Sequence, residues 1–404
     1  MSTAIVCGAT GILGREIVSL LASNPQKWKT IHALSRSKKD DYPSNVIHNH
    51  IDLLHSAEEM AAELKDVSAE YVFFAAYMEQ ATEAENWKVN GDMLQNFLNA
   101  LTFTGATKSL KRILLVTGCK HYGVHLGRPK LPMLESDPWL TDQSVYPPNF
   151  YYRQQNILHD FCKENPHIGW NVTYPNDVIG FAHGNFMNLA SGLGIYAAVS
   201  KELGQKLAFP GAERFYSGFD CFTSSKLHAE FCEWVVLEEK ARNQAFNVVN
   251  GDVQAWEDMW PRLARRFGME VDAGQFQQEV DMKLGAKVEM NETPPIKIWE
   301  KELGLEGRVK RNVLSQRVSM VKWAQQEEVK KAWERLAERE GLQKDGLEKG
   351  TWKFVDFELG RDFDCVVSMS KAREYGWSGY QDSWKAFSDV FGELEAAKVL
   401  PKTH

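Results

Sequence analysis

The sequence predicts an α/β fold, namely a doubly wound parallel sheet with a smaller C-terminal cap. Three observations support this class: short apolar runs alternate with helical patterns up to about residue 200, a glycine-rich turn follows the first run, and the alternation loosens after about residue 205. The chain of 404 residues, with 44% hydrophobic and 25% charged residues, has the composition of an ordinary globular protein.

The first apolar run, residues 3–7, is typical of a buried parallel strand and leads into the glycine turn. Gly8, Gly11 and Gly14 are three residues apart and directly precede a helical pattern. In that order they allow a tight turn, a close backbone approach to a pyrophosphate, and packing of the helix on the strand. The spacing therefore predicts a Rossmann-type sheet with a dinucleotide at the helix N-terminus; a tight turn without a ligand is the alternative.

The second strand, residues 30–34, is followed by a basic segment with Arg36 and Ser37 instead of an acidic residue. NAD-binding folds usually carry a carboxylate here for the ribose 2′-hydroxyl, whereas an arginine can bind a 2′-phosphate. The segment thus favours NADPH, and a solvated basic loop is the alternative.

Two further strands are expected at 46–51 and 71–75, with a helix at 85–101. The first ends at Asp52 and Leu53, where such folds contact adenine, and the second ends at Ala76 and Tyr77, where small residues let a cofactor lie flat.

The fifth strand, residues 112–116, leads into Thr117, Lys120 and His121. The carboxyl ends of parallel strands line the ligand crevice, so Lys120 is a candidate for the chemistry, with a plain surface charge as the alternative. We expect His121 to be structural or part of the pocket wall.

A long polar loop, 123–147, has the length of a segment that caps a site, and a tyrosine pair then opens a helix. A tyrosine in that first turn can place its hydroxyl beside a nicotinamide. A strand at 170–174 follows, and Phe181, Phe186 and Met187 are expected either to form an apolar pocket wall or to lie in the core.

The second half has weaker patterns. We expect a short strand and turn at 208–211, a strand at 245–249 and another at 352–357, with helices at 223–236, 322–341, 368–374 and 383–397. Residues 1–200 are predicted to form most of the Rossmann domain and 201–404 mainly the substrate-binding cap, with some segments returning to the Rossmann lobe.

Charge and cysteine usage exclude several classes. A net charge of −7 argues against nucleic acid as the main partner. The six cysteines are scattered without zinc-ligand spacing, so we expect no metal and reduced thiols in the cytoplasm. The longest apolar stretch, near 189–199, is too short to span a bilayer, and the oligomeric state stays open, a homodimer included.

Together these motifs resemble the extended short-chain dehydrogenase/reductases, more narrowly the progesterone 5β-reductase/iridoid synthase-like (PRISE-like) group. The matching pieces are Gly8 to Gly14, Arg36, Asp52, Asn90-Gly91, Thr117 to Tyr122, Asn149 to Tyr152, Gly180-Phe181, Met187-Asn188, Phe209 to Gly211, Ala245 to Asn247 and Ser368 to Lys371. The chain departs from the group at Ser37, Asn156, Tyr174 and an expanded 310–350 region.

The resemblance implies that Tyr152 and Lys120 form the catalytic pair. It also implies that the cofactor is contacted by Thr10, Gly11, Ile12, Arg36, Ser37, Asp52, Leu53, Ala76, Val178, Asn185, Phe186 and Met187. We expect Thr117 beside that cofactor, and Tyr77, Phe181 and His121 in the substrate pocket.

The expected activity is NADPH-dependent hydride addition to the activated C=C bond of an apolar enone or enal, such as a terpenoid or polyketide intermediate of secondary metabolism. Reduction of the carbonyl itself and cyclisation are alternatives on the same tyrosine and lysine. A redox-neutral epimerase or dehydratase and a non-catalytic NADP-binding module are further alternatives.

Overall fold

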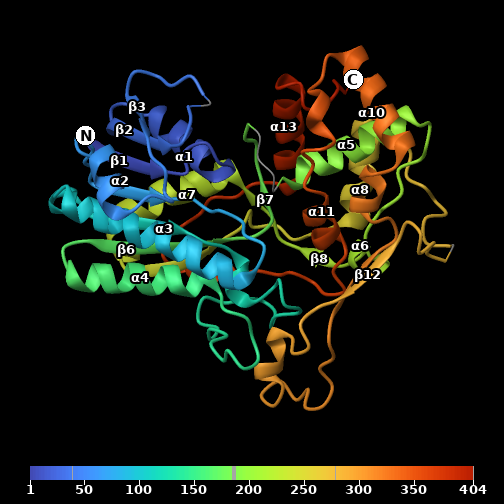
Figure 1. The fold of residues 1–404 in the computed structure, drawn as a ribbon. Helices are drawn as coiled ribbons and strands as arrows, with labels where there is room; N and C mark the ends of the chain where they lie inside the picture. Colours follow the sequence, from blue (N-terminus) through green and yellow to red (C-terminus); the bar gives the residue numbers. More distant parts are fainter. Residues whose placement is uncertain (39, 184–187, 278, 404) are drawn as a thin grey trace.

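The computed structural model describes residues 1–38, 40–183, 188–277 and 279–403. A parallel seven-stranded sheet in the order β10-β6-β5-β4-β1-β2-β3 organises the first half of the chain (Figure 1). Its strands are β1 (Ser2–Cys7), β2 (Trp28–Ser35), β3 (Val46–His50), β4 (Tyr71–Phe74), β5 (Arg112–Val116), β6 (Gly169–Pro175) and β10 (Gln244–Val248). The order reverses between β1 and β4, which is the switch point of a doubly wound sheet and confirms the predicted fold class.

Helices cover both faces of this sheet. α1 (Ile12–Ala22) packs against α7 (Ser225–Leu237), while α3 (Glu83–Phe103) packs between α2 (Ala57–Glu63) and α4 (Phe150–Glu164). Short 3-10 helices η1 (Ala106–Ser109), η2 (Cys119–Tyr122) and η3 (Glu239–Ala241) join these elements. Since α7 and β10 belong to this layer, the second half of the chain completes the sheet.

A second hydrophobic core lies beside the sheet (Figure 1). Its helices are α5 (Leu189–Glu202), α6 (Glu213–Tyr216), α8 (Trp256–Arg266), α9 (Met320–Ala324), α10 (Glu327–Glu340), α11 (Trp352–Leu359) and α13 (Ser383–Ala396). α12 (Ser370–Glu374) packs against β10 and belongs to the core of the sheet. Shorter pieces beside the second core are β7 (Val178–Ile179), β8 (Phe219–Asp220), β9 (Thr223–Ser224), β11 (Gln254–Ala255) and η5 (Lys344–Gly346). We refer to this part as the cap.

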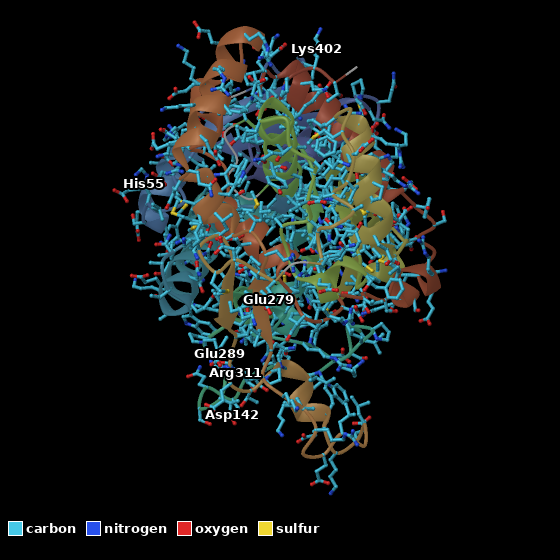
Figure 2. All side chains as sticks on the ribbon, turned by 90° about the vertical axis from the view of Figure 1, so that its right-hand side faces the viewer. His55, Asp142, Glu279, Glu289, Arg311 and Lys402 are labelled. Atoms are coloured by element: carbon cyan, nitrogen blue, oxygen red, sulfur yellow. The ribbon has the colours of Figure 1, made fainter. Side chains whose placement is uncertain are left out.

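One segment projects from the cap. β12 (Ala286–Glu289) pairs antiparallel with β13 (Val313–Gln316), and η4 (Pro295–Trp299) lies between them. The guanidinium of Arg311 lies 2.5 Å from the carboxylate of Glu289 at the base of this projection (Figure 2). None of the helices in the described ranges is long and apolar enough to cross a bilayer.

Three predicted elements of the cap are wrong. Residues 352–357 belong to α11, because Trp352, Val355 and Leu359 bury one helical face, rather than to a strand. The expected helix at 322–341 is two helices that break after Ala324, and residues 208–211 form no strand, since only Leu207 bridges to Val271.

Candidate active site

The glycine turn has the shape that a pyrophosphate requires. Gly8 has φ +77°, in the left-handed region that glycine adopts without strain, and its N–H donates to the carbonyl of Leu34 at 3.1 Å. A Cβ on Gly14 would collide with the carbonyl oxygen of Gly8, so only glycine lets α1 approach the strand this closely. The turn ends at Ile12, where the N-terminus of α1 presents its positive dipole end.

Other predicted cofactor residues lie at the carboxyl ends of neighbouring strands. Arg36 and Ser37 follow β2 and are exposed, whereas Asp52 and Leu53 follow β3 and are half-buried. Thr10 lies within the glycine turn itself. Parallel strands end at one edge of the sheet, so these side chains share that edge, and Asn185, Phe186 and Met187 lie outside the described residues.

A cavity of about 1030 Å³ opens between this edge and the cap. From the sheet side it is lined by Ala76, Tyr77, Thr117, Lys120 and Tyr151, and Val178 of β7 also contributes to the lining. From the cap side its aromatic lining is Trp333, Trp352, Phe354 and Phe357. Tyr77, which we expected in the substrate pocket, lines this cavity, and its ring stacks on Phe150 with the centroids 5.4 Å apart.

Tyr151 is the tyrosine of the pair that faces the cavity. A Cβ placed on Gly118 would lie 3.3 Å from the Tyr151 hydroxyl and 3.3 Å from the carbonyl oxygen of Pro175. The phenol thus lies at the carboxyl ends of β5 and β6. Burial raises the pKa of Tyr151, so the group is a neutral hydrogen-bond donor at neutral pH.

Asn149 connects this tyrosine to the lysine loop. As the N-cap of α4, its side-chain oxygen accepts from the N–H of Tyr151 at 3.0 Å. Its amide nitrogen donates to the carbonyl of Lys120 at 2.7 Å. One side chain therefore fixes the start of α4 against the segment that carries the lysine.

Lys120 also lines the cavity. Its side chain is 36% exposed, and its ammonium lies 3.7 Å from the carboxylate of Glu83 at the start of α3. Tyr151 and Lys120 thus face the same space, and a cation there favours negative charge on nearby oxygens.

The placement expected for Tyr152 is wrong. Its hydroxyl points away from the cavity, donating to the carbonyl of His121 at 2.6 Å and accepting from the N–H of Leu140 at 3.0 Å. Its ring stacks on Trp139 with the centroids 4.7 Å apart. Adjacent residues on a helix point about 100° apart, so only one of the two tyrosines can face the cavity.

His121 and Phe181 are not pocket residues either. His121 is 2% exposed and stacks on Tyr174 with centroids 4.2 Å apart, and burial lowers its pKa to about 3. Phe181 belongs to the cap core, where the guanidinium of Arg15 lies 5.1 Å from its ring centroid. Both residues were considered either for the pocket wall or for a structural role, and the geometry supports the structural role for each.

Sequence reasoning missed the charged part of the cavity wall. Asp177, Glu358 and Arg361 line the cavity, and burial removes all three from bulk water. The available signal was the i, i+3 spacing of Glu358 and Arg361, which is a helical spacing. It went unnoticed because residues 352–357 were expected to form a strand.

Comparison with known proteins identifies the family. The model of the PRISE-like Rossmann-fold domain matches residues 4–305. An uncharacterised protein of Schizosaccharomyces pombe is 41% identical over 99% of this chain and 98% of its own length. The (S)-8-oxocitronellyl enol synthase of Nepeta racemosa is 30% identical, and the 3-oxo-Delta(4,5)-steroid 5-beta-reductase of Arabidopsis thaliana is 29% identical, each over 99% of this chain and 93% of the relative.

Among solved structures, the Bordetella bronchiseptica enzyme WbmG in complex with NAD and UDP aligns with a TM-score of 0.59 at 12% identity. The alignment covers 99% of this chain and 96% of that chain, and it supports the fold alone. With the family match over three quarters of the sequence and relatives aligned end to end, the resemblance seen in the motifs is confirmed: the chain belongs to the PRISE-like Rossmann-fold domain family.

Proposed function

We propose that the protein is an NADPH-dependent reductase that adds hydride to the activated C=C bond of an apolar enone or enal. The observation that carries the proposal is the Tyr151 hydroxyl, which lies beside Gly118 in a cavity that Lys120 also lines. Relatives named as a steroid 5-beta-reductase and an enol synthase support a reductive role on a carbonyl compound.

The residues that would hold the cofactor are those at the carboxyl edge of the sheet. The turn from Gly8 to Gly14 would take the pyrophosphate, Arg36 and Ser37 the 2′-phosphate, and Asp52 and Leu53 the adenine. Ala76, Thr117 and Val178 would then lie beside the nicotinamide. When bound there, NADPH supplies a hydride.

Tyr151 would act on the carbonyl oxygen of the substrate. Hydride addition at the β-carbon of an enone puts negative charge on that oxygen, and a donor fixed beside it lowers the barrier by about 3 kcal/mol. Tyr151 is neutral and therefore able to donate. The ammonium of Lys120 would stabilise the negative charge as it is shared with the phenol oxygen.

The aromatic cap wall supports an apolar substrate. Trp333, Trp352, Phe354 and Phe357 offer large hydrophobic faces opposite Tyr151. A cavity of about 1030 Å³ has the size of sites that bury drug-sized ligands. The chemistry of the wall suits a polycyclic or terpenoid-like carbonyl compound.

A panel of enones and aldehydes, incubated with NADPH deuterated at C4 of the nicotinamide, tests the proposal. We expect NADPH consumption and deuterium at the β-carbon of at least one enone. Deuterium on the carbonyl carbon would instead assign carbonyl reduction, and a cyclised product would assign a cyclase. Substrate conversion without net NADPH consumption would assign a redox-neutral reaction.

A further inference from the structure

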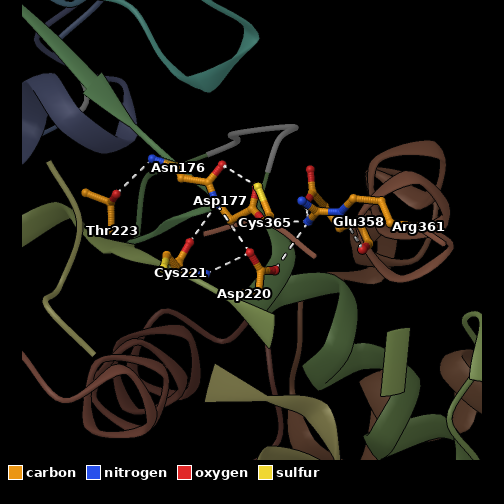
Figure 3. Close-up of polar contacts among 8 residues, drawn as sticks. All are labelled: Asn176, Asp177, Asp220, Cys221, Thr223, Glu358, Arg361 and Cys365. Carbon is orange, nitrogen blue, oxygen red and sulfur yellow. Dashed lines mark hydrogen bonds and ion pairs between the residues drawn. The ribbon is translucent and has the colours of Figure 1, made fainter. Parts of the chain in front are cut away.

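A buried arginine lies among three carboxyl groups, those of Asp177, Asp220 and Glu358 (Figure 3). Arg361, Asp177 and Glu358 also line the cavity. The Nη2 atom of Arg361 lies 2.5 Å from Asp177 Oδ2 and 3.4 Å from Asp220 Oδ2, and it is hydrogen-bonded to Glu358 Oε2. We call these four residues the Arg361 cluster. Their side chains are between 1% and 8% exposed, so water screens them little.

The charges of the cluster do not balance if every carboxyl group is ionised. One guanidinium would face three carboxylates around a single nitrogen atom, and like charges this close in a buried site cannot all persist. Protons on two of the three carboxyl groups make the cluster neutral. Burial, and then the charge of Asp177, raise the pKa of Glu358 and Asp220, although Arg361 opposes the rise. The charge of Arg361 lowers the pKa of Asp177 in spite of burial.

Among the described residues, the amide and thiol groups that contact the cluster add no charge to it. Asn176 donates its amide to Asp220 Oδ1 at 3.3 Å, and the Cys365 thiol lies 3.7 Å from the Asn176 carbonyl oxygen (Figure 3). The thiols of Cys119, Cys221 and Cys365 stay protonated because burial raises the pKa of each. The balance of charge is therefore set within the cluster, where burial raises the pKa of Glu358.

Glu358 and Tyr151 line the same cavity from different parts of the fold. Glu358 lies on α11 of the cap, whereas Tyr151 lies on α4 against the sheet. The two walls meet near Pro175, whose carbonyl lies beside Gly118 and Tyr151 and which precedes Asp177 by two residues. A substrate with its carbonyl oxygen on Tyr151 would thus have a carboxylic acid within the same cavity.

Reduction of an enone needs such an acid. After hydride from the nicotinamide has reached the β-carbon, the product is an enolate whose α-carbon still lacks a proton. We propose that Glu358 donates its proton to this α-carbon, an inference that rests on the reductase function proposed above. The enolate electron pair forms the new C–H bond, the carbonyl double bond returns, and the O–H bond of Glu358 breaks. Arg361 stabilises the resulting carboxylate until a solvent proton replaces the one transferred.

The substitution that tests this role is Glu358→Gln, which keeps the shape and replaces the neutral acid with a neutral amide. Glu328→Gln, an exposed glutamate in the first turn of α10, is the matched control. The substrate is 2-methyl-2-cyclohexen-1-one with NADPH deuterated at C4 of the nicotinamide. Deuterium at C3 of the product reports hydride addition, and the configuration at C2 reports how the α-carbon was protonated.

We expect wild type and Glu328→Gln to give deuterium at C3 and one C2 enantiomer in excess. Glu358→Gln should keep the deuterium at C3 but give racemic C2, because the enol leaves and is protonated in water. An unchanged enantiomeric excess in Glu358→Gln, or racemic C2 in wild type, overturns the role of Glu358 alone. Absence of deuterium at the β-carbon in wild type, with this enone and with every enone of the panel above, overturns the proposed function and this inference with it.

A measurement without substrate tests the proton directly. Infrared spectra of the full-length protein at neutral pH should contain a carboxylic acid C=O stretching band that Glu358→Gln loses and Glu328→Gln retains. Identical carboxylic acid bands in wild type and in folded Glu358→Gln would show that Glu358 is ionised and would overturn the proposal. Wild-type spectra without any such band would do the same.

Discussion

The two adjacent tyrosines give a paired test of the proposed chemistry. Tyr151→Phe removes the hydroxyl that faces the cavity, and Tyr152→Phe removes the one that is bonded inside the protein. We expect Tyr151→Phe to lower kcat/KM by about 10²-fold, since a positioned donor contributes about 3 kcal/mol to the transition state. Its free energy of unfolding should change by less than about 0.5 kcal/mol.

Tyr152→Phe should have the opposite profile. The substitution leaves the N–H of Leu140 and the carbonyl of His121 without the hydroxyl that now pairs with both. Each unsatisfied buried group costs about 1–3 kcal/mol, so we expect a loss of about 2–4 kcal/mol in the free energy of unfolding. Activity per folded molecule should stay within about threefold of wild type, because the Tyr152 hydroxyl should contribute less than about 1 kcal/mol to transition-state stabilisation.

The assay combines steady-state reduction of an enone with urea unfolding of the same preparations. NADPH binding, followed by fluorescence, should be retained in both variants, which separates chemistry from cofactor affinity. The reasoning is refuted if Tyr152→Phe loses turnover while Tyr151→Phe keeps it, because the hydroxyl that faces the cavity would then be dispensable.

Three further predictions concern the cofactor site and acid stability. Arg36→Ala should weaken NADPH binding and spare NADH, and equal losses for both in titrations would remove the 2′-phosphate role of Arg36. Gly14→Ala should raise the NADPH Kd at least about tenfold because its Cβ has no space, whereas Gly392→Ala, with open space around it, should leave the Kd unchanged. Burial lowers the pKa of His121 and His228 to about 3, below the ordinary value of 6.5, so only the unfolded chain binds these protons between those pH values. The free energy of unfolding should therefore be highest above pH 6.5 and fall with acidification, by about 2 kcal/mol per histidine down to pH 5; a His228→Asn variant with the wild-type pH dependence would contradict this.

The sheet could be predicted from the sequence because its signals are local. Buried parallel strands such as Arg112–Val116 are mostly continuous apolar runs. Glycines spaced as Gly8, Gly11 and Gly14 between a strand and a helix are typical of a dinucleotide-binding turn. Ligands of such sheets bind at the carboxyl ends of the strands, and this rule alone predicts Lys120 and Thr117 beside the cavity that they line.

The incorrect predictions of site residues concern side chains whose role depends on which side of a helix faces which neighbouring element. Tyr151 and Tyr152 follow the same N-cap, and packing against Trp139 and Leu140 decides which hydroxyl faces the cavity. No periodicity within the helix contains that information, because the partners come from the preceding loop.

Residues 352–357 were misassigned for a related reason. Aromatic and β-branched residues such as Trp352 and Val355 favour strands locally. Packing reverses this preference, since α11 lies against α5 where Gly192 leaves room for Val355. With the helix unrecognised, the Arg361 cluster could not be predicted, because its members come from three distant parts of the chain.

The double contact of Asn149 has a consequence for variation in the preceding loop. One amide ties the backbone of Lys120 to the backbone of Tyr151, so two hydrogen bonds hold these segments together across the loop that separates them in sequence. The composition of that loop is nevertheless constrained, because its Trp139 and Leu140 hold Tyr152 and so leave Tyr151 facing the cavity. Length changes in the rest of the loop are thus compatible with the same approach of the Lys120 segment to the start of α4.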